Sequence, residues 1–340
     1  MTAGASKEIR NILVIHVSRI GDTLLATPAI RAIATAYPNA KLTCLAHPKR
    51  KEILEGLPFI HHLGSITKKR APFLGWLSRK NYDLAIVFGF DKPLVAYALR
   101  VAQRVVAFEQ GADHLDKRLF KSATEPPFQS CHAVEYLLRL PDTIGIPRAG
   151  LHLSYQVSVM EKQWARQELS TLRANHATPL IGLQIASFPT KGYRDWPIEN
   201  FITLCQRIRA DHPNAHFLIF GGALEKDRTH ALHHALENCS GLYAGRLTLR
   251  QTGALMNEID LYIGIDTGPT HIMGALHRPM VAMYHGYSPS RLLAPLDHPC
   301  LYAIDHPLAD RCTPEAEMSE ITIDLVWETV QKALTEHPPQ

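Results

Sequence analysis

Short, almost entirely apolar segments alternate with amphipathic segments along most of this chain. The first apolar run covers residues 11–17 (NILVIHV), and residues 23–38 then carry apolar side chains at helical spacing. Similar apolar runs follow at residues 41–47 and 83–89. Parallel strands that are covered on both faces have this continuous hydrophobic character. The alternation therefore predicts an α/β protein with parallel sheets.

A second series of the same kind begins at residues 179–186, and further apolar runs and helical patterns follow it. A last helical pattern at residues 321–336 has no strand after it. At 340 residues the chain suits two domains of ordinary size better than a single core. We therefore expect a first domain over residues 1–165, a second over residues 166–318, and a terminal segment over residues 319–340.

The formal net charge of +4 hides an asymmetry between the two halves. Residues 1–150 hold 21 Lys and Arg against 12 Asp and Glu, whereas residues 151–340 hold 15 against 20. The basic half suits an anionic substrate or an anionic membrane surface, and solvated loop charges are the alternative. Aromatic residues do not interleave with the basic runs, so we expect no nucleic-acid partner. The basic clusters singled out are Lys49, Arg50 and Lys51, and Lys68, Lys69 and Arg70.

The chain shows no segment that predicts membrane insertion or export. No stretch approaches the ~20 unbroken apolar residues of a membrane-spanning helix. The first residues, MTAGASKEIRN, lack the apolar core of a signal peptide. The six cysteines are scattered without the spacing of a metal site or a disulfide framework, so we expect free thiols. A cytoplasmic protein without a bound metal is the resulting expectation.

Ligands of open parallel sheets bind at the loops that follow the carboxyl ends of strands. The first such loop is SRIGD at residues 18–22. Gly21 is expected to permit a tight turn into the helix, and Asp22 is either the N-cap of that helix or a functional carboxylate. The spacing matches neither the dinucleotide fingerprint nor the P-loop, so neither of these nucleotide sites is expected.

Two further loops carry polar side chains at the ends of predicted strands. Glu225, which follows two glycines, can accept both hydroxyl groups of a ribose, or it can simply favour the start of a helix. In the other loop, hydroxyl groups and two cations precede a helix, an arrangement that can hold a diphosphate. A polar surface loop is the alternative. The residues of this second loop are Ser187, Thr190, Lys191 and Arg194.

The most informative loop is GIDTGPTHIMGAL at residues 264–276. Asp266, Thr267 and Gly268 end a predicted strand, and a proline then opens a helix. Backbone N–H groups at this helix start form an anion cradle that needs no metal. His271, in the first turn, would by itself more often be a packing histidine, and Asp266 by itself could be a cap.

Together these segments resemble the glycosyltransferase family 9 enzymes, the ADP-heptose:lipopolysaccharide heptosyltransferases. The resemblance runs along nearly the whole chain, and the order and spacing of the segments make it specific. The similar segments are residues 17–32, 131–146, 186–201, 220–227, 244–289 and 312–326. The family often has a second Ser after Ser18, where this chain has Arg19.

The resemblance implies the glycosyltransferase B (GT-B) fold, with two Rossmann-like parallel-sheet domains facing across a cleft. The first domain would bind the acceptor and the second the nucleotide sugar, and residues 319–340 would cross back to the first domain. The implied reaction moves a heptose from ADP-heptose to a hydroxyl of the lipopolysaccharide inner core, carried on Kdo, heptose and lipid A. It proceeds with inversion and without a metal ion, and this chain likewise has no Asp-x-Asp motif. No cofactor is expected.

The resemblance also implies roles for individual residues. Asp22 corresponds to the base that takes the proton of the acceptor hydroxyl, on the sugar face opposite the leaving diphosphate. Ser18 and Gly21 would line the same pocket and help to bind the donor. The remaining implied donor contacts are Ser187, Thr190, Lys191 and Arg194 at the diphosphate, Thr267 and Gly268 as phosphate cradle, Asp266 and His271 near the sugar, Glu225 at the ribose, and Leu247 over the adenine.

Two other functions remain open at this point. One is a GT-B enzyme that uses another nucleotide sugar in capsule, natural-product or protein glycosylation. The other is a nucleotide-sugar-binding protein without catalysis. The basic clusters of the first half fit a phosphorylated, lipid-linked acceptor, which predicts peripheral association with the cytoplasmic face of the inner membrane.

Overall fold

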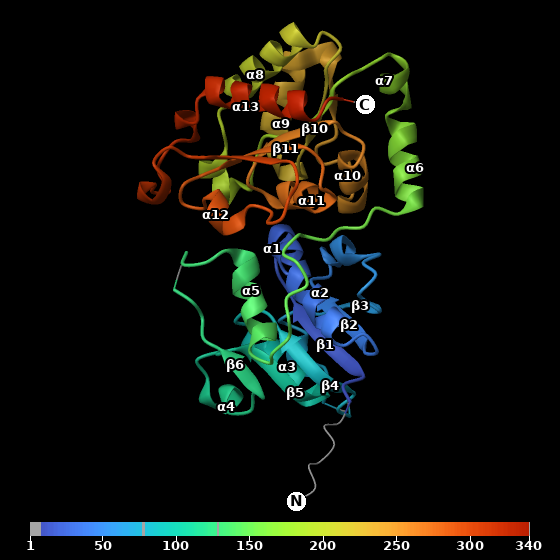
Figure 1. The fold of residues 1–340 in the computed structure, drawn as a ribbon, viewed down its shortest axis with the longest axis vertical. Coiled ribbons are helices and arrows are strands. Elements are labelled where there is room, and N and C mark those ends of the chain that lie inside the picture. Colours follow the sequence, from blue (N-terminus) through green and yellow to red (C-terminus); the bar gives the residue numbers. More distant parts are fainter. Residues whose placement is uncertain (1–7, 77–78, 128, 340) are drawn as a thin grey trace, which may run out of the picture. The chain divides into compact units, whose positions relative to one another are not determined.

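The computed structural model describes residues 8–76, 79–127 and 129–339. It divides into two compact units, Met1–Ser154 and Tyr155–Gln340, and each holds one six-stranded parallel sheet (Figure 1). The prediction of an α/β protein with parallel sheets is confirmed. The boundary between the units lies in the segment between the two predicted series of strands, and it precedes the expected end of the first domain at residue 165.

The first sheet has the strand order β3-β2-β1-β4-β5-β6. Its central strand β1 is buried at every residue after Asn11, because parallel neighbours flank it on both sides. In this register Val14 pairs with Cys44 on one side and with Ile86 on the other. The strands are β1 (Asn11–His16), β2 (Lys41–Ala46), β3 (His62–Ser65), β4 (Tyr82–Val87), β5 (Ala102–Phe108) and β6 (Lys121–Ala123).

The helices of the first unit follow the strands in alternation. The single helix expected at residues 23–38 is two helices, α1 and α2, which meet at Ala26. Helix α3 packs on the face of the sheet that carries Leu13 and Ile15, whereas α2 packs against α5. The helices are α1 (Ile20–Leu25), α2 (Thr27–Ala36), α3 (Lys92–Val101), α4 (Asp113–Asp116) and α5 (Ala133–Asp142), with short 3-10 turns η1 (Lys51–Leu54) and η2 (Ala71–Phe73).

The second sheet has the strand order β12-β11-β10-β7-β8-β9. Three of its four inner strands, β11, β10 and β7, are buried at every residue, which explains their largely apolar sequences. The strands are β7 (Leu180–Gln184), β8 (His216–Phe220), β9 (Ser240–Leu242), β10 (Leu261–Ile265), β11 (Met280–Tyr284) and β12 (Leu301–Asp305).

Eight α-helices are assigned in the described part of the second unit, and most connect its strands. They are α6 (Val159–Glu168), α7 (Ser170–Ala174), α8 (Ile198–Asp211), α9 (Lys226–Leu236), α10 (Leu249–Met256), α11 (Gly268–Leu276), α12 (Ser290–Leu293) and α13 (Ile323–Glu336). Within the residues described above, none of the helices has the length and apolar character needed to cross a membrane.

The last helix, α13, belongs to the second unit, so the prediction that residues 319–340 cross back to the first is wrong. Its apolar face packs on α8, β11 and β12 and completes the core of that unit (Figure 1). Upstream of the helix, the buried Trp196 donates its indole N–H to Ile321 O at 2.8 Å. Arg207 on α8 pairs with Asp324 at 2.6 Å. A crossing would expose the buried residues Val326, Val330 and Ala333.

We expect Val330→Ala to lower the free energy of unfolding by about 2 kcal/mol, because the substitution removes two methyl groups from a packed core. Val330 is fully buried. Val159→Ala is the matched control, since Val159 is 70% exposed on α6, and it should change stability by less than about 0.5 kcal/mol. Urea unfolding measures both values. Equal effects of the two substitutions would contradict the packing of α13.

Candidate active site

Asp22 is an exposed carboxylate in the first turn of α1, at the carboxyl end of β1. The Ser18 hydroxyl donates to Asp22 Oδ2 at 2.7 Å, and the Arg19 N–H lies 3.4 Å from the same oxygen. Among the described residues, Oδ1 has no hydrogen-bond partner. The N-cap is Arg19, so the interpretation of Asp22 as N-cap is wrong. Gly21 lies inside the helix rather than in a turn before it, so that expectation is corrected as well.

The buried His16 holds this loop through a hydrogen bond to its backbone, and the sequence analysis missed this residue. Its ring is buried at the end of β1, with Nε2 3.1 Å from Asp22 O. A carbonyl only accepts, so Nε2 carries the proton and donates. Burial lowers the pKa of His16, against the opposing effect of the Asp22 charge, so the ring is neutral at pH 7. The buried histidine thereby fixes the backbone of the residue whose carboxylate is exposed.

The predicted acceptor clusters follow β2 and β3, at the same edge of the sheet as Asp22. Arg50 joins the Asp22 loop directly, since its Nη1 donates to Ser18 O at 3.0 Å. Lys68 instead pairs with Asp91, which follows β4, at 2.5 Å. Of the other four residues, Lys51 is half-buried, and the exposed ones are Lys49, Lys69 and Arg70.

In the second unit, a buried carboxylate joins two cationic or potentially cationic side chains. Asp266, 1% exposed at the end of β10, lies with Oδ2 2.6 Å from Arg194 Nη1 and with Oδ1 3.4 Å from His271 Nε2. Burial alone would raise the pKa of Asp266, but the His271 hydrogen bond and the Arg194 charge lower it overall. Asp266 is therefore ionised at neutral pH and positions the other two side chains. We call these three residues the Arg194–Asp266–His271 cluster.

The cluster lies at the start of α11, whose N-cap is Thr267 and whose first residue is Gly268. The N–H groups of a first helical turn have no partner within the helix and attract anions. Thr270 fixes this turn: its hydroxyl donates to Ile265 O at 2.5 Å, accepts from the Thr267 N–H at 3.3 Å and lies 2.8 Å from the Tyr262 hydroxyl. Sequence patterns did not single out Thr270 or Tyr262, because each looks like an ordinary core residue.

The loop after β7 brings Arg194 to the cluster. Ser187 is buried, its hydroxyl lies 2.7 Å from both Lys191 O and Asp195 Oδ1, and it therefore shapes the loop. Lys191 Nζ and Arg194 Cζ each lie 5.5 Å from the centre of the Tyr193 ring. Tyr193, which the sequence analysis also missed, accepts a hydrogen bond from Arg194 Nε at 3.3 Å.

The other predicted donor residues lie in neighbouring loops. Thr190 is exposed in the loop after β7. Glu225 follows β8, the strand next to β7, and Leu247 lies half-buried between β9 and α10. Burial raises the pKa of Glu225, and the charge of Asp195 acts in the same direction. Oε2 of Glu225 would lie 2.6 Å from a Cβ at position 222, so Gly222 leaves room for this carboxylate.

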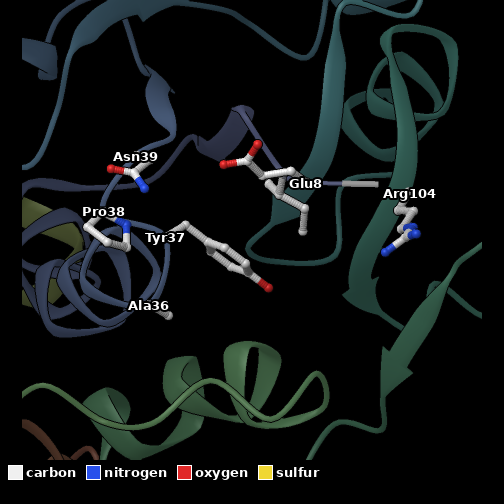
Figure 2. A pocket seen from close by; sticks show the side chains of 7 residues that line it. Glu8, Ala36, Tyr37, Pro38, Asn39 and Arg104 are labelled. Carbon is white, nitrogen blue, oxygen red and sulfur yellow. The ribbon is translucent and has the colours of Figure 1, made fainter. Parts of the chain in front are cut away.

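Neither a metal cluster nor the pocket of Figure 2 forms part of this candidate site. Across residues 8–76, 79–127 and 129–339, no three His, Cys, Asp or Glu side chains converge as metal ligands would. A pocket of about 390 Å³ is lined by Tyr37, Asn39 and Arg104, among others, and Figure 2 shows these side chains. These residues lie at the amino ends of the strands of the first sheet, whereas Asp22 lies at the carboxyl ends.

Comparisons with known proteins identify the family of this chain and its fold. The family model described as Glycosyltransferase family 9 (heptosyltransferase) matches residues 75–305, more than half of the chain. Lipopolysaccharide heptosyltransferase 3 of Escherichia coli is 26% identical over 282 residues, which cover 78% of this chain and 80% of that protein.

Two solved structures share the fold at low sequence identity. The glycosyl transferase family 9 protein of Veillonella parvula DSM 2008 superposes with a TM-score of 0.83 at 18% identity, covering 96% of this chain and 98% of that one. The E. coli ADP-heptose LPS heptosyltransferase II superposes with a TM-score of 0.78 at 21% identity. The superposition covers 96% of this chain and 99% of that one.

Proposed function

Because the chain belongs to glycosyltransferase family 9, the heptosyltransferase family, we propose that it transfers a heptose from ADP-heptose to a hydroxyl group of the lipopolysaccharide inner core. The chain is a glycosyltransferase with the GT-B fold, one Rossmann-like sheet in each unit. The observation that carries the proposal is the Arg194–Asp266–His271 cluster at the first turn of α11. The proposed reaction inverts the anomeric carbon and needs no metal ion.

On the donor side, the leaving group is ADP, whose negative charge grows as the bond from the sugar to the diphosphate breaks. The Gly268 N–H in the first turn of α11 and the guanidinium of Arg194 would stabilise this charge, whereas the Thr267 N–H already donates to the Thr270 hydroxyl. A single well-placed donor is typically worth about 3 kcal/mol in the transition state. These two donors, held in place by the packed structure, would take the place of a divalent cation.

Glu225 and Leu247 would hold the nucleoside, at the ribose hydroxyls and the adenine ring. Lys191, Thr190 and the structural Ser187 would complete the diphosphate loop. These assignments are supported by the order of the strands, because β10, β7, β8 and β9 are successive neighbours and the loops after them follow one edge of the sheet.

On the acceptor side, Asp22 would take the proton from the attacking hydroxyl while that oxygen bonds to the anomeric carbon and the bond to ADP breaks. The proton ends on the Asp22 carboxyl, and the electron pair of the broken bond leaves with ADP. Oδ1 suits this step because Ser18 already occupies Oδ2. Arg50, with the exposed Lys49, Lys69 and Arg70, would attract the phosphates of a lipid-linked acceptor. We accordingly propose that the enzyme works on the cytoplasmic face of the inner membrane.

The test is a donor panel with a Kdo–lipid A acceptor, measured as nucleotide release and glycosylated product. We expect ADP-heptose to be used at least about 10-fold better than UDP-, GDP- or dTDP-sugars. A wrong base would leave polar groups in the nucleoside site without hydrogen-bond partners, and such a donor therefore binds poorly. Activity should persist in excess EDTA, and NMR of the product should show the anomeric configuration opposite to that of the donor. A preference for another nucleotide would contradict the proposed donor. Loss of activity in EDTA would contradict the metal-independent reaction, and retention of the anomeric configuration would contradict inversion.

A further inference from the structure

The segment Ala71–Trp76, which we call the aromatic loop, presents two large apolar rings to solvent. It follows β3 and begins with the 3-10 turn η2, which packs beside α3. Phe73 is 82% exposed and Trp76 is 76% exposed. Contiguous exposed apolar surface marks interaction sites, whereas single exposed apolar residues need no explanation.

The protein holds this loop in a fixed shape. Arg100 on α3 donates from Nη2 to Ala71 O at 2.6 Å and from Nε to Leu74 O at 3.1 Å. The Trp76 indole N–H donates to Pro72 O at 2.5 Å. Gly75 has a φ of +80°, where a side chain would be strained and its Cβ would lie 3.0 Å from Val101.

These hydrogen bonds also allow the loop to enter an apolar environment. Three carbonyl groups of the loop and the only polar group of the tryptophan ring are satisfied within the protein. Moving an unsatisfied polar group out of water costs several kcal/mol, and this loop avoids that cost for the groups named. Its two rings can therefore leave water, and tryptophan is the residue that favours the interface of a bilayer.

The charged residues that neighbour the aromatic loop in the sequence are all basic. Residues 66–80 contain five Lys and Arg and no Asp or Glu. Lys68 is paired with Asp91, and the exposed cations are Lys69, Arg70, Arg79 and Lys80. The rings of Phe73 and Trp76 thus lie between two basic runs, which corrects the expectation that no aromatic residues accompany them. A surface of apolar rings flanked by cations is complementary to an anionic bilayer.

We propose that the aromatic loop inserts into the headgroup region of an anionic lipid bilayer, with Phe73 and Trp76 as its apolar anchors. The flanking cations contact the lipid phosphates. This inference extends the membrane association proposed above, and it names the element that makes it. It does not depend on which sugar is transferred, so it is tested without donor or acceptor.

The experiment is co-sedimentation of the full-length protein with vesicles of phosphatidylcholine alone or mixed with phosphatidylglycerol. We expect binding to the anionic vesicles only, and a loss of roughly tenfold or more in the double variant Phe73→Ser/Trp76→Ser. Phe120→Ser is the matched control, because Phe120 is also an exposed ring beside an arginine, Arg104, at 5.2 Å, and its binding should equal that of the unmodified protein.

Two further readouts separate insertion from simple charge attraction. Trp76→Phe should keep vesicle binding and abolish the vesicle-induced blue shift of tryptophan fluorescence. Lys69→Gln/Arg70→Gln should weaken binding at ~0.1 M salt and matter little near 1 M, where screening shortens to about 3 Å.

Several outcomes would overturn the inference. They are equal binding of the double variant and the unmodified protein, absence of binding to anionic vesicles, and a blue shift that persists in Trp76→Phe. Two others would assign the loop to another partner: a dimer in sedimentation equilibrium that the double variant abolishes, or tight binding of a single-stranded oligonucleotide that the double variant loses. Heptose transfer to a soluble acceptor analogue should be unchanged in the double variant, so a failure here is distinct from a failure of the proposed function.

Discussion

Asp22→Asn is expected to lower kcat for heptose transfer by about 10²–10⁴-fold, the range typical for removal of a general base. Asparagine has nearly the shape of aspartate and can still accept a hydrogen bond from Ser18, but it cannot take up a proton. The affinity for ADP should stay the same, because Asp22 lies in the first unit and the proposed nucleotide residues lie in the second. Steady-state kinetics with ADP-heptose and isothermal titration with ADP separate the two effects.

Asp113→Asn is the control for this substitution. Asp113 is also an exposed aspartate in the first turn of a helix of the first unit, α4, and it pairs with the exposed Lys117 at 2.7 Å. Its activity should match that of the unmodified enzyme. Loss of the first-turn charge at α1 is expected to cost at most about 1 kcal/mol of stability, so thermal unfolding should show that Asp22→Asn is folded. If Asp22→Asn retains more than a tenth of kcat, another group is the base.

Arg194→Gln is expected to lower kcat/KM by about 10²–10³-fold and to weaken ADP binding, because it removes the cation that we propose stabilises the leaving diphosphate. The substitution also leaves the buried Asp266 carboxylate with His271 as its remaining partner in the cluster. Removing one member of a buried ion pair typically costs about 3–5 kcal/mol of stability, so unfolding must be measured alongside activity. Arg207→Gln, at an exposed ion pair on α8, is the control and should leave both quantities nearly unchanged.

The same cluster gives this prediction a pH signature. The pKa of Asp266 is lower in the folded protein than its ordinary value, so its ionised form adds stability that is fully present above a pH of about 4 and is lost as the pH falls further. In Arg194→Gln the pKa of Asp266 should rise, so the acid limb of the stability curve, which is the loss of stability below a pH of about 4, should become smaller. An unchanged limb together with an unchanged kcat/KM would show that Arg194 touches neither Asp266 nor the donor.

The sequence predicts the central strands well and the edge strands poorly. Strands β1, β7, β10 and β11 are continuous apolar runs, because neighbouring strands and helices cover them. The edge strands β6 and β9 have three residues each and include polar or glycine residues, so no periodicity identifies them. Strand β5 was not predicted for another reason. Helix α3 ends at Val101 and β5 begins at Ala102, so no turn residue separates them.

The candidate site was predicted as a set of residues rather than as a set of contacts. The loop after β10 is evident from its Asp-Thr-Gly-Pro sequence, and Arg194 is evident as a cation after a strand. Their ion pair is not, because it joins residues 72 positions apart through the order of β7 and β10 in the sheet. His16 and Thr270 act through buried hydrogen bonds to backbone atoms. No sequence motif or residue spacing indicates such a role.

The pairing of Arg194 with Asp266 has a consequence for turnover. A guanidinium that already shares its charge with a neighbouring carboxylate attracts a diphosphate less strongly than an isolated one would. With Arg194 in the proposed role at the diphosphate, this pairing should weaken the binding of ADP and speed its release after each transfer. Sensitivity to product inhibition should accordingly rise when position 266 is made neutral by Asp266→Asn.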